Sequence, residues 1–328
     1  MNNSNEAVKQ MKESMRLPVI MAPMFLVSNP KMVTEACAAG IVGTFPALNA
    51  RTKEILEQWM EQITSELDAM KKNDPKQQIA PWGINFITHR SNKRYTEDLQ
   101  LIEKYKPPIV ITSLGDPSPV VKIAHEYGGV VFSDVINIKF AKKAIEKGAD
   151  GLVLVASGAG GHAGELNPIP FIHEVRSFFS GPIILAGGMS KGEDILASEI
   201  LGADFVYMGT RFIPSEESAA SQEYKQMIVE SAIEDIIYTD AFSGVNANYL
   251  IPSITKAGLD PVNLQAKQEI DFNKLQTDAK AWKDIWGAGQ GIGPIKEIQP
   301  IQAIVDELEV AYEQAKMKIR QDHGVSVK

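Results

Sequence analysis

Short apolar segments and amphipathic segments follow one another in turn along most of this 328-residue chain. This order of segments limits the possible folds more than any other feature of the sequence. The apolar segments lack the polar–apolar alternation of half-exposed strands, which is typical of parallel strands covered on both faces. The segments between them have helical patterning. The predicted strands are 19–22, 41–44, 83–86, 109–112, 130–134, 151–155, 183–186 and 205–208, and the predicted helices include 51–72, 95–105, 118–127, 138–147 and 192–201.

Eight strands separated by helices favour an α/β fold, the (β/α)8 TIM barrel. Lys-Gly-Ala-Asp at 147–150 and Leu-Gly-Ala-Asp at 201–204 indicate a repeated unit in which a glycine ends a helix before the next strand. Such a barrel needs about 250 residues, so we expect the surplus in an insertion. We therefore predict three parts: the barrel with its ligand site in 1–231, a C-terminal insertion or small lid subdomain in 232–299, and a closing helix in 300–328.

Composition argues against several classes of partner. The chain has 33 basic and 41 acidic residues, a formal charge of −8, and no dense basic block of the kind that binds nucleic acid. The longest apolar runs are of strand length, well short of the roughly 20 residues that a membrane span needs. The lone cysteine, Cys37, cannot form an internal disulfide, and the N-terminus lacks a signal-peptide core. We expect a cytoplasmic protein without nucleic-acid or membrane partners.

A histidine among glycines follows the strand 151–155. The segment Gly158-Ala-Gly-Gly-His162-Ala-Gly164 places an imidazole where little side-chain bulk surrounds it. Imidazole exchanges protons near neutral pH, so we expect His162 to be catalytic. The remaining histidines lack such flanks and are expected to be surface or structural residues: His89, His125, His173 and His323.

Three further loops follow strand ends, and in a barrel of this type such loops meet at one face. Glycine-containing loops after the last two strands occupy the positions where such barrels hold a phosphate with backbone N–H groups. The loop after the first strand carries a proline and a methionine, which suit either contact with a flat ring or an ordinary apolar turn. These loops are Ala22-Pro23-Met24, Gly187-Gly188 and Gly209-Thr210.

The segment 158–163 also fits the dinucleotide fingerprint G-x-G-x-x-A. Pro168 and Pro170 argue against a long helix starting at this loop, and no acidic residue ends the next strand, so that interpretation is disfavoured. The glycine-rich stretch 287–293 is expected to be a loop or the edge of a lid. No H-E-x-x-H, C-x-x-C, G-x-S-x-G or Walker motif occurs, so we predict no metal site and expect a cofactor to supply the chemistry.

These motifs together resemble the nitronate monooxygenase family, formerly called 2-nitropropane dioxygenases, which are FMN-dependent barrels. The resemblance covers nearly the whole chain, but related flavoproteins, the FMN-dependent enoyl-ACP reductases and NADH:quinone reductases, share its motifs. The family's chemistry implies a nitronate or nitroalkane substrate that reduces FMN, O2 as the oxidant, and a carbonyl compound and nitrite as products.

The resemblance also implies roles for individual residues. His162 would take the α-proton of a neutral nitroalkane or hydrogen-bond a nitronate. Asn85, after the third strand, would reach the flavin or substrate, unless it only caps its loop. The remaining cofactor-binding residues implied in this way are Ala22, Pro23 and Met24 along the flavin, Gly160 and Gly161 beside it, and Gly187, Gly188, Gly209 and Thr210 at its phosphate.

One position departs from the family pattern. Many relatives have a lysine or a small hydroxyl residue at the end of the fifth strand, where this chain has Asp134. A carboxylate there opposes an anionic ligand unless it is protonated or paired with a base such as Lys139. Asp134 therefore either faces the pocket or closes a turn. Asn248 and Tyr249 are candidate substrate contacts, with a packed tyrosine as the alternative.

Two other functions stay open. One is NAD(P)H-dependent reduction of quinones or enoyl thioesters on the same cofactor, and the other is a non-redox barrel that binds a phosphate ligand. The partner is expected to be a small molecule, and a homodimer stays open because the sequence does not fix the oligomeric state.

Overall fold

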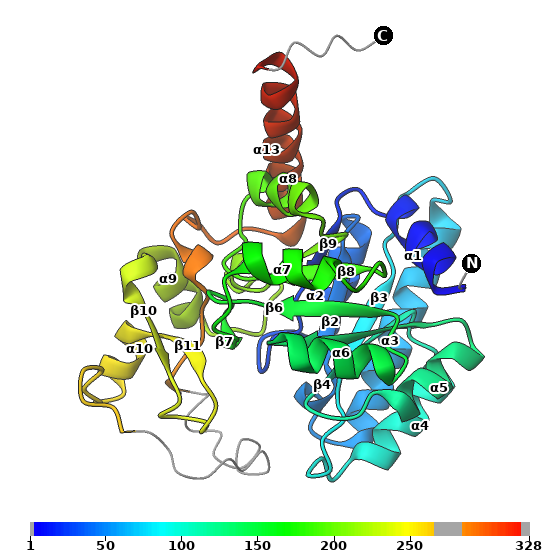
Figure 1. The fold of residues 1–328 in the computed structure, drawn as a ribbon, viewed down its shortest axis with the longest axis horizontal. Helices are drawn as coiled ribbons and strands as arrows, with labels where there is room; N and C mark the ends of the chain where they lie inside the picture. The colour runs from blue at the N-terminus through cyan, green and yellow to red at the C-terminus, as the bar shows by residue number, and fades with distance from the viewer. Residues whose placement is uncertain (1–2, 266–283, 323–328) are drawn as a thin grey trace.

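The structure is a computed structural model that describes residues 3–265 and 284–322. Its centre is a closed barrel of parallel strands surrounded by helices (Figure 1). The strands follow one another around the barrel in chain order, and β9 pairs with β1 to close it. The barrel strands are β1 (Val19–Met21), β2 (Val42–Pro46), β3 (Trp82–Ile87), β4 (Ile109–Ser113), β5 (Val130–Val135), β6 (Gly151–Val155), β8 (Ile183–Ala186) and β9 (Phe205–Met208).

The predicted barrel is confirmed, and the predicted strand ends differ from the observed ones by at most two residues. The strands are buried almost throughout, because helices cover their outer face and packed side chains fill the interior. The helices are α1 (Asn3–Glu13), α2 (Pro30–Ala38), α3 (Lys53–Asn73), α4 (Tyr95–Tyr105), α5 (Ser118–Glu126), α6 (Ile138–Glu146), α7 (Pro168–Arg176), α8 (Gly192–Leu201), α9 (Gln222–Glu230), α10 (Ile251–Lys256) and α13 (Ile301–Asp322).

The N-terminal end of the barrel is closed by α1. Val8 and Met11 of this helix belong to the same apolar cluster as Ile20 and Phe205 of the strands. Barrels of this type bind their ligands at the opposite end, where the strands have their carboxyl ends. We call that end the barrel mouth.

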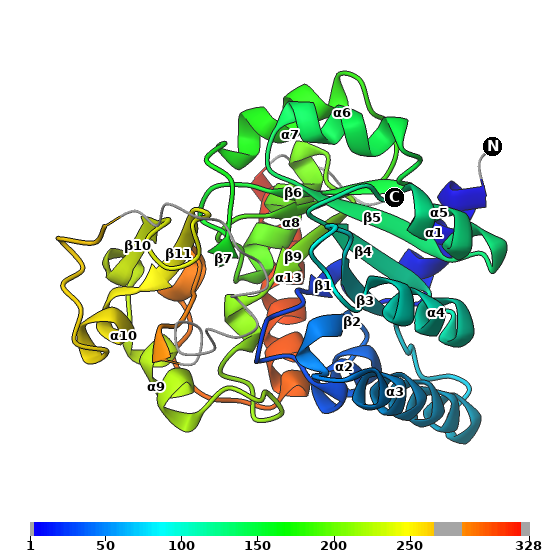
Figure 2. The same cartoon turned by 90° about the horizontal axis from the view of Figure 1, so that it is seen from below.

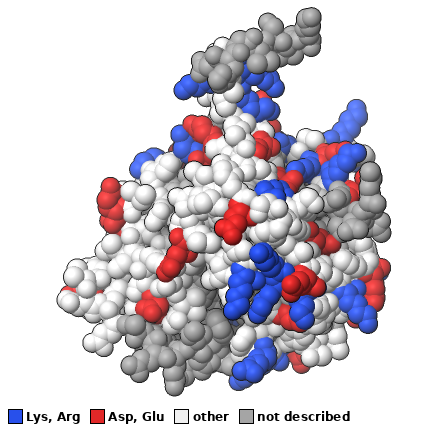
Figure 3. Space-filling model, in the orientation of Figure 1, with Lys and Arg blue, Asp and Glu red and all other residues white. Residues whose placement is uncertain are grey.

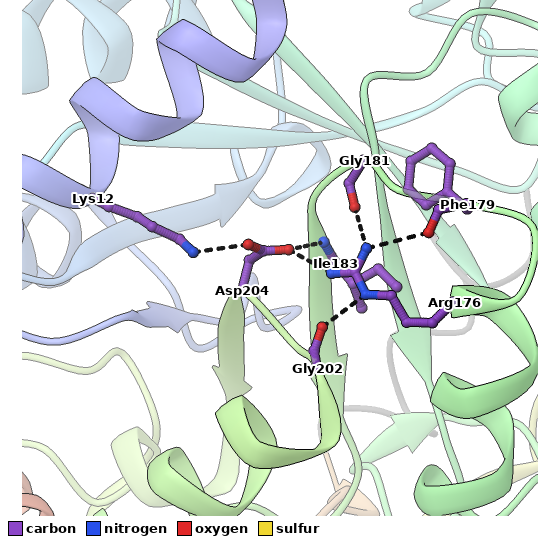
Figure 4. A network of polar contacts seen from close by, with 7 residues as sticks. All are labelled: Lys12, Arg176, Phe179, Gly181, Ile183, Gly202 and Asp204. Atoms are coloured by element: carbon purple, nitrogen blue, oxygen red, sulfur yellow. Dashed lines mark hydrogen bonds and ion pairs between the residues drawn. The ribbon is translucent and has the colours of Figure 1, made fainter.

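The repeated Gly-Ala-Asp units explain how two helices turn into the next strands at the closed end. Gly148 and Gly202 both have positive φ, 88° and 103°, as expected for glycines that end helices. The Asp204 carboxylate accepts a hydrogen bond from the Ile183 N–H at 2.9 Å and pairs with Lys12 and Arg176 (Figure 4). This network therefore ties α1 and α7 to the base of two adjacent strands.

A small antiparallel sheet lies beside the barrel (Figure 2). It has the order β10-β11-β7, from β10 (Ile236–Thr239), β11 (Ala247–Leu250) and β7 (Gly161–His162). Two of its strands come from the predicted insertion, and β7 comes from the glycine-rich loop after β6. The insertion and the histidine loop are thus joined by backbone hydrogen bonds.

The C-terminal helix α13 runs along the outside of the barrel next to α8 and extends beyond it in Figure 1. Arg211 pairs with Glu307 of this helix at 2.5 Å, and Arg16 pairs with Glu309, so its first half is tied to the barrel. The predicted division at 231 and 299 stays a prediction, and parts of it, 266–283 and 323–328, lie outside the described residues. Within the described ranges, no helix combines the length and apolar character needed to cross a membrane.

Candidate active site

Loops from the first and last barrel strands meet at the barrel mouth. Gly209 follows β9, and a Cβ added to it would lie 3.6 Å from both the Ala22 Cβ and the Met24 Sδ. These are ordinary van der Waals distances, so a methyl group would fit at Gly209. The glycine leaves this space unfilled, and we call it the open position. Pro23 lies between them in the chain, which places the whole predicted first loop at this end.

His162 lies in β7, an edge strand of the small sheet. Its backbone pairs with Ala247 of β11, and its Nε2 atom lies 2.9 Å from the Ser243 Oγ atom. The Ser243 hydroxyl donates to the Val245 carbonyl oxygen at 2.8 Å. Because a serine has one hydroxyl proton, we assign the His162 Nε2–H as the donor to Ser243, and the proton-accepting nitrogen of this tautomer is Nδ1.

Burial keeps His162 uncharged at neutral pH. It lowers the pKa of the imidazole to about 4, since the charged form would lose its hydration. A neutral imidazole can accept a proton, although a pKa this low makes it a weak base until a ligand changes its surroundings.

The glycines before His162 permit a close approach of the loop 287–293. A Cβ on Gly160 would lie 2.8 Å from the Gly289 nitrogen, a separation that packed carbon atoms do not adopt. The Gln290 N–H donates to the Gly158 carbonyl oxygen at 2.8 Å, and the Gly289 N–H donates to the Thr210 Oγ atom at 2.8 Å. The stretch 287–293 therefore forms part of the wall of the candidate site.

The predicted phosphate loops carry unused backbone donors. Gly187 and Gly188 have φ values of 140° and 72°, which only glycine adopts readily, and they turn the chain from β8 toward α8. None of the described residues accepts a hydrogen bond from the N–H of Gly188 or Thr210. These two N–H groups follow the adjacent strands β8 and β9, and unpaired backbone donors in such loops suit a phosphate group.

A chain of polar side chains lies inside the barrel at its mouth. Asn85 of β3 donates to the Ser113 Oγ atom at 2.7 Å, and Ser113 of β4 donates to the Asp134 Oδ2 atom at 2.5 Å. The other carboxylate oxygen, Oδ1, is buried and has no hydrogen-bond partner among the described residues. A buried, unpaired acceptor costs free energy, so this atom indicates a place for a hydrogen-bond donor on a ligand.

The electrostatics of Asp134 follow from its position. Burial raises the pKa of its carboxyl to about 6, and the hydrogen bond from Ser113 opposes part of that rise. Lys139 forms no ion pair with Asp134. Tyr207 of β9 lies close by: burial and the Asp134 charge both raise the pKa of its hydroxyl. Protonation and pairing with a base were the two ways in which a carboxyl here could avoid repelling an anionic ligand. The raised pKa of Asp134 supports partial protonation, and Lys139 provides no pairing.

Asn248 and Tyr249 lie in β11, next to the histidine loop. The Asn248 amide donates to the Ala159 carbonyl oxygen at 2.7 Å and so links β11 to the glycine-rich loop. Tyr249 is 1% exposed, and its ring packs edge-on against Phe242 at 4.9 Å. These contacts explain how both residues support the loop that carries His162, and a substrate role for either stays a prediction.

Three polar residues of the site were not singled out from the sequence. Ser113 and Tyr207 stand near the ends of β4 and β9, where barrel enzymes place functional residues, so their positions offered a signal. Ser243 offered none, because it lies in a loop 81 residues from His162. Across 3–265 and 284–322, no group of three or more His, Cys, Asp or Glu residues is arranged to hold a metal ion.

Comparisons with known proteins point to one family. A family model described as nitronate monooxygenase matches residues 7–310. A protein of Staphylococcus aureus (strain MSSA476) named probable nitronate monooxygenase is 28% identical over 263 residues, which cover 70% of this chain and 74% of that protein.

Two solved structures share the barrel. A nitroalkane oxidase from Streptomyces ansochromogenes has a TM-score of 0.79 at 20% identity, over 94% of this chain and 99% of that chain. FabK from Thermotoga maritima has a TM-score of 0.78 at 24% identity, over 96% and 98% of the two chains. At these identities the two structures establish the fold alone.

Proposed function

This chain belongs to the nitronate monooxygenase family, and from that premise we propose that it oxidises alkyl nitronates or nitroalkanes with O2, using FMN as its cofactor. The products are a carbonyl compound and nitrite. The observation that carries the proposal is the position of His162, a neutral imidazole at the barrel mouth whose tautomer is set by Ser243.

The residues at the mouth fit a flavin nucleotide. The N–H groups of Gly188 and Thr210 would hold the phosphate, and the open position at Gly209 would admit the ligand beside Met24. Asn85, already linked to Ser113, would orient the ring or substrate through its amide. When bound, FMN would accept two electrons from the substrate and return them to O2.

His162 would handle the proton. With its Nε2–H donated to Ser243, its Nδ1 atom would take the proton from the carbon next to the nitro group of a neutral nitroalkane. A nitronate has already lost that proton, so His162 would only hydrogen-bond it. The burial that lowers the pKa of His162 makes the second role the easier one, which favours nitronates as the better substrates.

Asp134 would act on substrate choice. Its buried carboxyl has a pKa of about 6, so it carries more negative charge at pH 7 than at pH 5. It therefore repels an anionic substrate more strongly at pH 7. We therefore expect weaker binding of nitronates as the pH rises through 6. A neutral nitroalkane would not show this effect.

Anaerobic mixing tests the proposal. We expect the purified protein to show a flavin absorbance spectrum, and a nitronate to bleach it in the absence of oxygen. Bleaching by NADH or NADPH alone would contradict the proposal and support the reductase alternative. A protein without a flavin spectrum, and with no FMN uptake on reconstitution, would instead support a non-redox phosphate-binding barrel.

A further inference from the structure

Exposed apolar side chains follow β4, β5 and β6, three strands that are neighbours in the barrel. Leu114 comes directly after β4, Ile136 comes directly after β5, and Leu166 lies between β7 and α7. Phe140 and Ile169 lie in the first turns of α6 and α7. We call these five residues the apolar rim, and their exposed fractions are 42% at Leu114, 39% at Ile136, 46% at Phe140, 38% at Leu166 and 49% at Ile169.

The apolar rim borders the candidate active site. A Cβ added to Gly164, two residues after His162, would lie 3.1 Å from the Ile136 Cβ atom, so the histidine loop packs directly against the rim. The Ser157 N–H donates to the Leu166 carbonyl oxygen at 2.8 Å, which returns Leu166 to the end of β6. A ligand bound beside His162 would therefore have the rim as its neighbour.

The backbone of Leu114 is strained. Its φ is 63°, in the left-handed region that leucine rarely adopts. Such a conformation costs free energy, persists only where the surrounding structure holds it, and is found most often at functional sites. It occurs here directly after Ser113, whose hydroxyl donates to Asp134 inside the mouth. The loop thus turns a hydroxyl inward and leaves a leucine exposed beside it.

The extent of the rim limits what can cover it. Neighbouring strands are about 4.8 Å apart, so the strand ends from β4 to β6 span about 10 Å. A stable protein interface buries about 800 Å² on each partner, which is more than a strip of this width provides. An alkyl chain, by contrast, can lie along such a strip.

The charge beside the rim favours an anionic ligand. Figure 3 shows a group of basic side chains over α6 and mostly uncharged surface toward the small sheet. The basic residues of α6 are Lys139, Lys142 and Lys143, in a chain whose formal charge is −8. This local surplus of positive charge attracts anions to the side of the mouth where the rim lies.

Resting on the proposed function, we propose that the preferred substrates are nitronates with a medium-length, unbranched alkyl chain that lies on the apolar rim. The nitronate group would be held beside His162. Each methylene group that leaves water strengthens binding through the hydrophobic effect. Because a chain on an open strip is covered on one side only, we expect the affinity to rise about twofold for each added methylene group.

Calorimetric titration with straight-chain carboxylates tests the proposal without turnover. A carboxylate is a planar anion with two oxygen atoms, like a nitronate, but it has no nitro group to release. From butyrate to decanoate, six methylene groups longer, the dissociation constant should fall about 60-fold. A dissociation constant that does not change with chain length would overturn the proposal.

Substitutions locate the chain on the rim. Leu114→Gly removes a rim side chain and suits the positive φ, so this variant should melt at a temperature no lower than that of the parent. It should weaken decanoate binding about fourfold and leave butyrate binding unchanged, and Phe140→Ser should act in the same way. Ile200→Ser is the matched control, because Ile200 is 68% exposed on α8, on the outside of the barrel. Equal losses in the control and the rim variants would indicate non-specific binding and overturn the proposal.

Anaerobic mixing with nitronates separates this proposal from the proposed function. If nitronates bleach the flavin but carboxylate affinity does not depend on chain length, the oxidation stands and the role of the rim is refuted. If affinity rises with chain length and is lost in Leu114→Gly, but no nitronate bleaches the flavin, the rim binds alkyl anions and the oxidation is refuted. If both proposals are correct, kcat/KM for nitronates should rise about twofold for each methylene group, mainly through KM.

Discussion

Removal of the Ser243 hydroxyl tests the assigned tautomer of His162 most directly. In Ser243→Ala the His162 Nε2–H loses its acceptor at 2.9 Å, and neither tautomer is then favoured by this contact. Neutral nitroalkanes require the proton to move to Nδ1, whereas nitronates require no proton transfer. The variant should therefore lose activity with the first substrate and keep it with the second.

The size of the loss follows from a single hydrogen bond. Such a bond contributes about 0.5–1.5 kcal/mol, and each 1.36 kcal/mol corresponds to a factor of ten in rate. We expect kcat/KM for a neutral nitroalkane to fall about 2- to 13-fold, and kcat/KM for the corresponding nitronate to change by less than about twofold.

Steady-state oxygen consumption with both forms of one nitroalkane, normalised to bound flavin, measures the effect. Ser243→Thr keeps the hydroxyl and should retain most of the activity. Ser218→Ala is the matched control, because Ser218 is also buried but its hydroxyl donates to a backbone carbonyl oxygen, that of Ile213. Equal losses with both substrates in Ser243→Ala would refute the tautomer assignment and indicate a general effect on the loop.

Four further outcomes are expected. His162→Ala should lower kcat/KM for a neutral nitroalkane about 10²- to 10⁴-fold and for a nitronate much less, and equal losses would point to a positioning role. Asp134→Asn is compared with the parent in the flavin-free protein at pH 3.5 and at pH 7. The unfolding free energy of the variant minus that of the parent should rise by up to about 3 kcal/mol from the lower to the higher pH. The reason is that folding raises the pKa of the Asp134 carboxyl from 3.8 to about 6, so the parent loses stability as the pH rises through this range, whereas the asparagine does not titrate. The same difference between variant and parent at both pH values in urea titrations would contradict this. Gly209→Ala should fold normally, since its Cβ meets only ordinary contacts, yet weaken FMN binding about tenfold or more by filling the open position; unchanged affinity in a fluorescence titration would place the ligand elsewhere. Asp204→Asn should lower the unfolding free energy by about 1–3 kcal/mol without changing FMN affinity, and a parallel loss of FMN would show that the closed end of the barrel influences its mouth.

The candidate site was only partly predictable. The glycine loops at 187–188 and 209–210 and the histidine loop could be found because each follows a strand, and parallel strands present their carboxyl ends at one face of the barrel. The role of 287–293 could not, because it depends on how closely Gly289 approaches Gly160 in the folded chain. The pairing of β7 with β11 was likewise not predicted, since a two-residue strand has no periodic pattern.

The sequence by itself determined the order of strands and helices, and eight strands separated by helices favoured a barrel. Its apolar segments have the length and the continuous apolar character of buried parallel strands, and these properties can be read without any distant contact. The Gly-Ala-Asp units likewise fixed where helices end, since only glycine readily adopts the positive φ observed at Gly148 and Gly202.

Only the tertiary structure decided the chemistry of the mouth. Asn85, Ser113 and Asp134 come from three different strands, and they form a chain of hydrogen bonds because barrel closure turns all three inward at one level. Ser243 sets the tautomer of His162 because the insertion folds back as a strand beside β7. Hydrogen bonds and burial depend on distances between residues far apart in the chain, and those distances exist only once the whole barrel has packed.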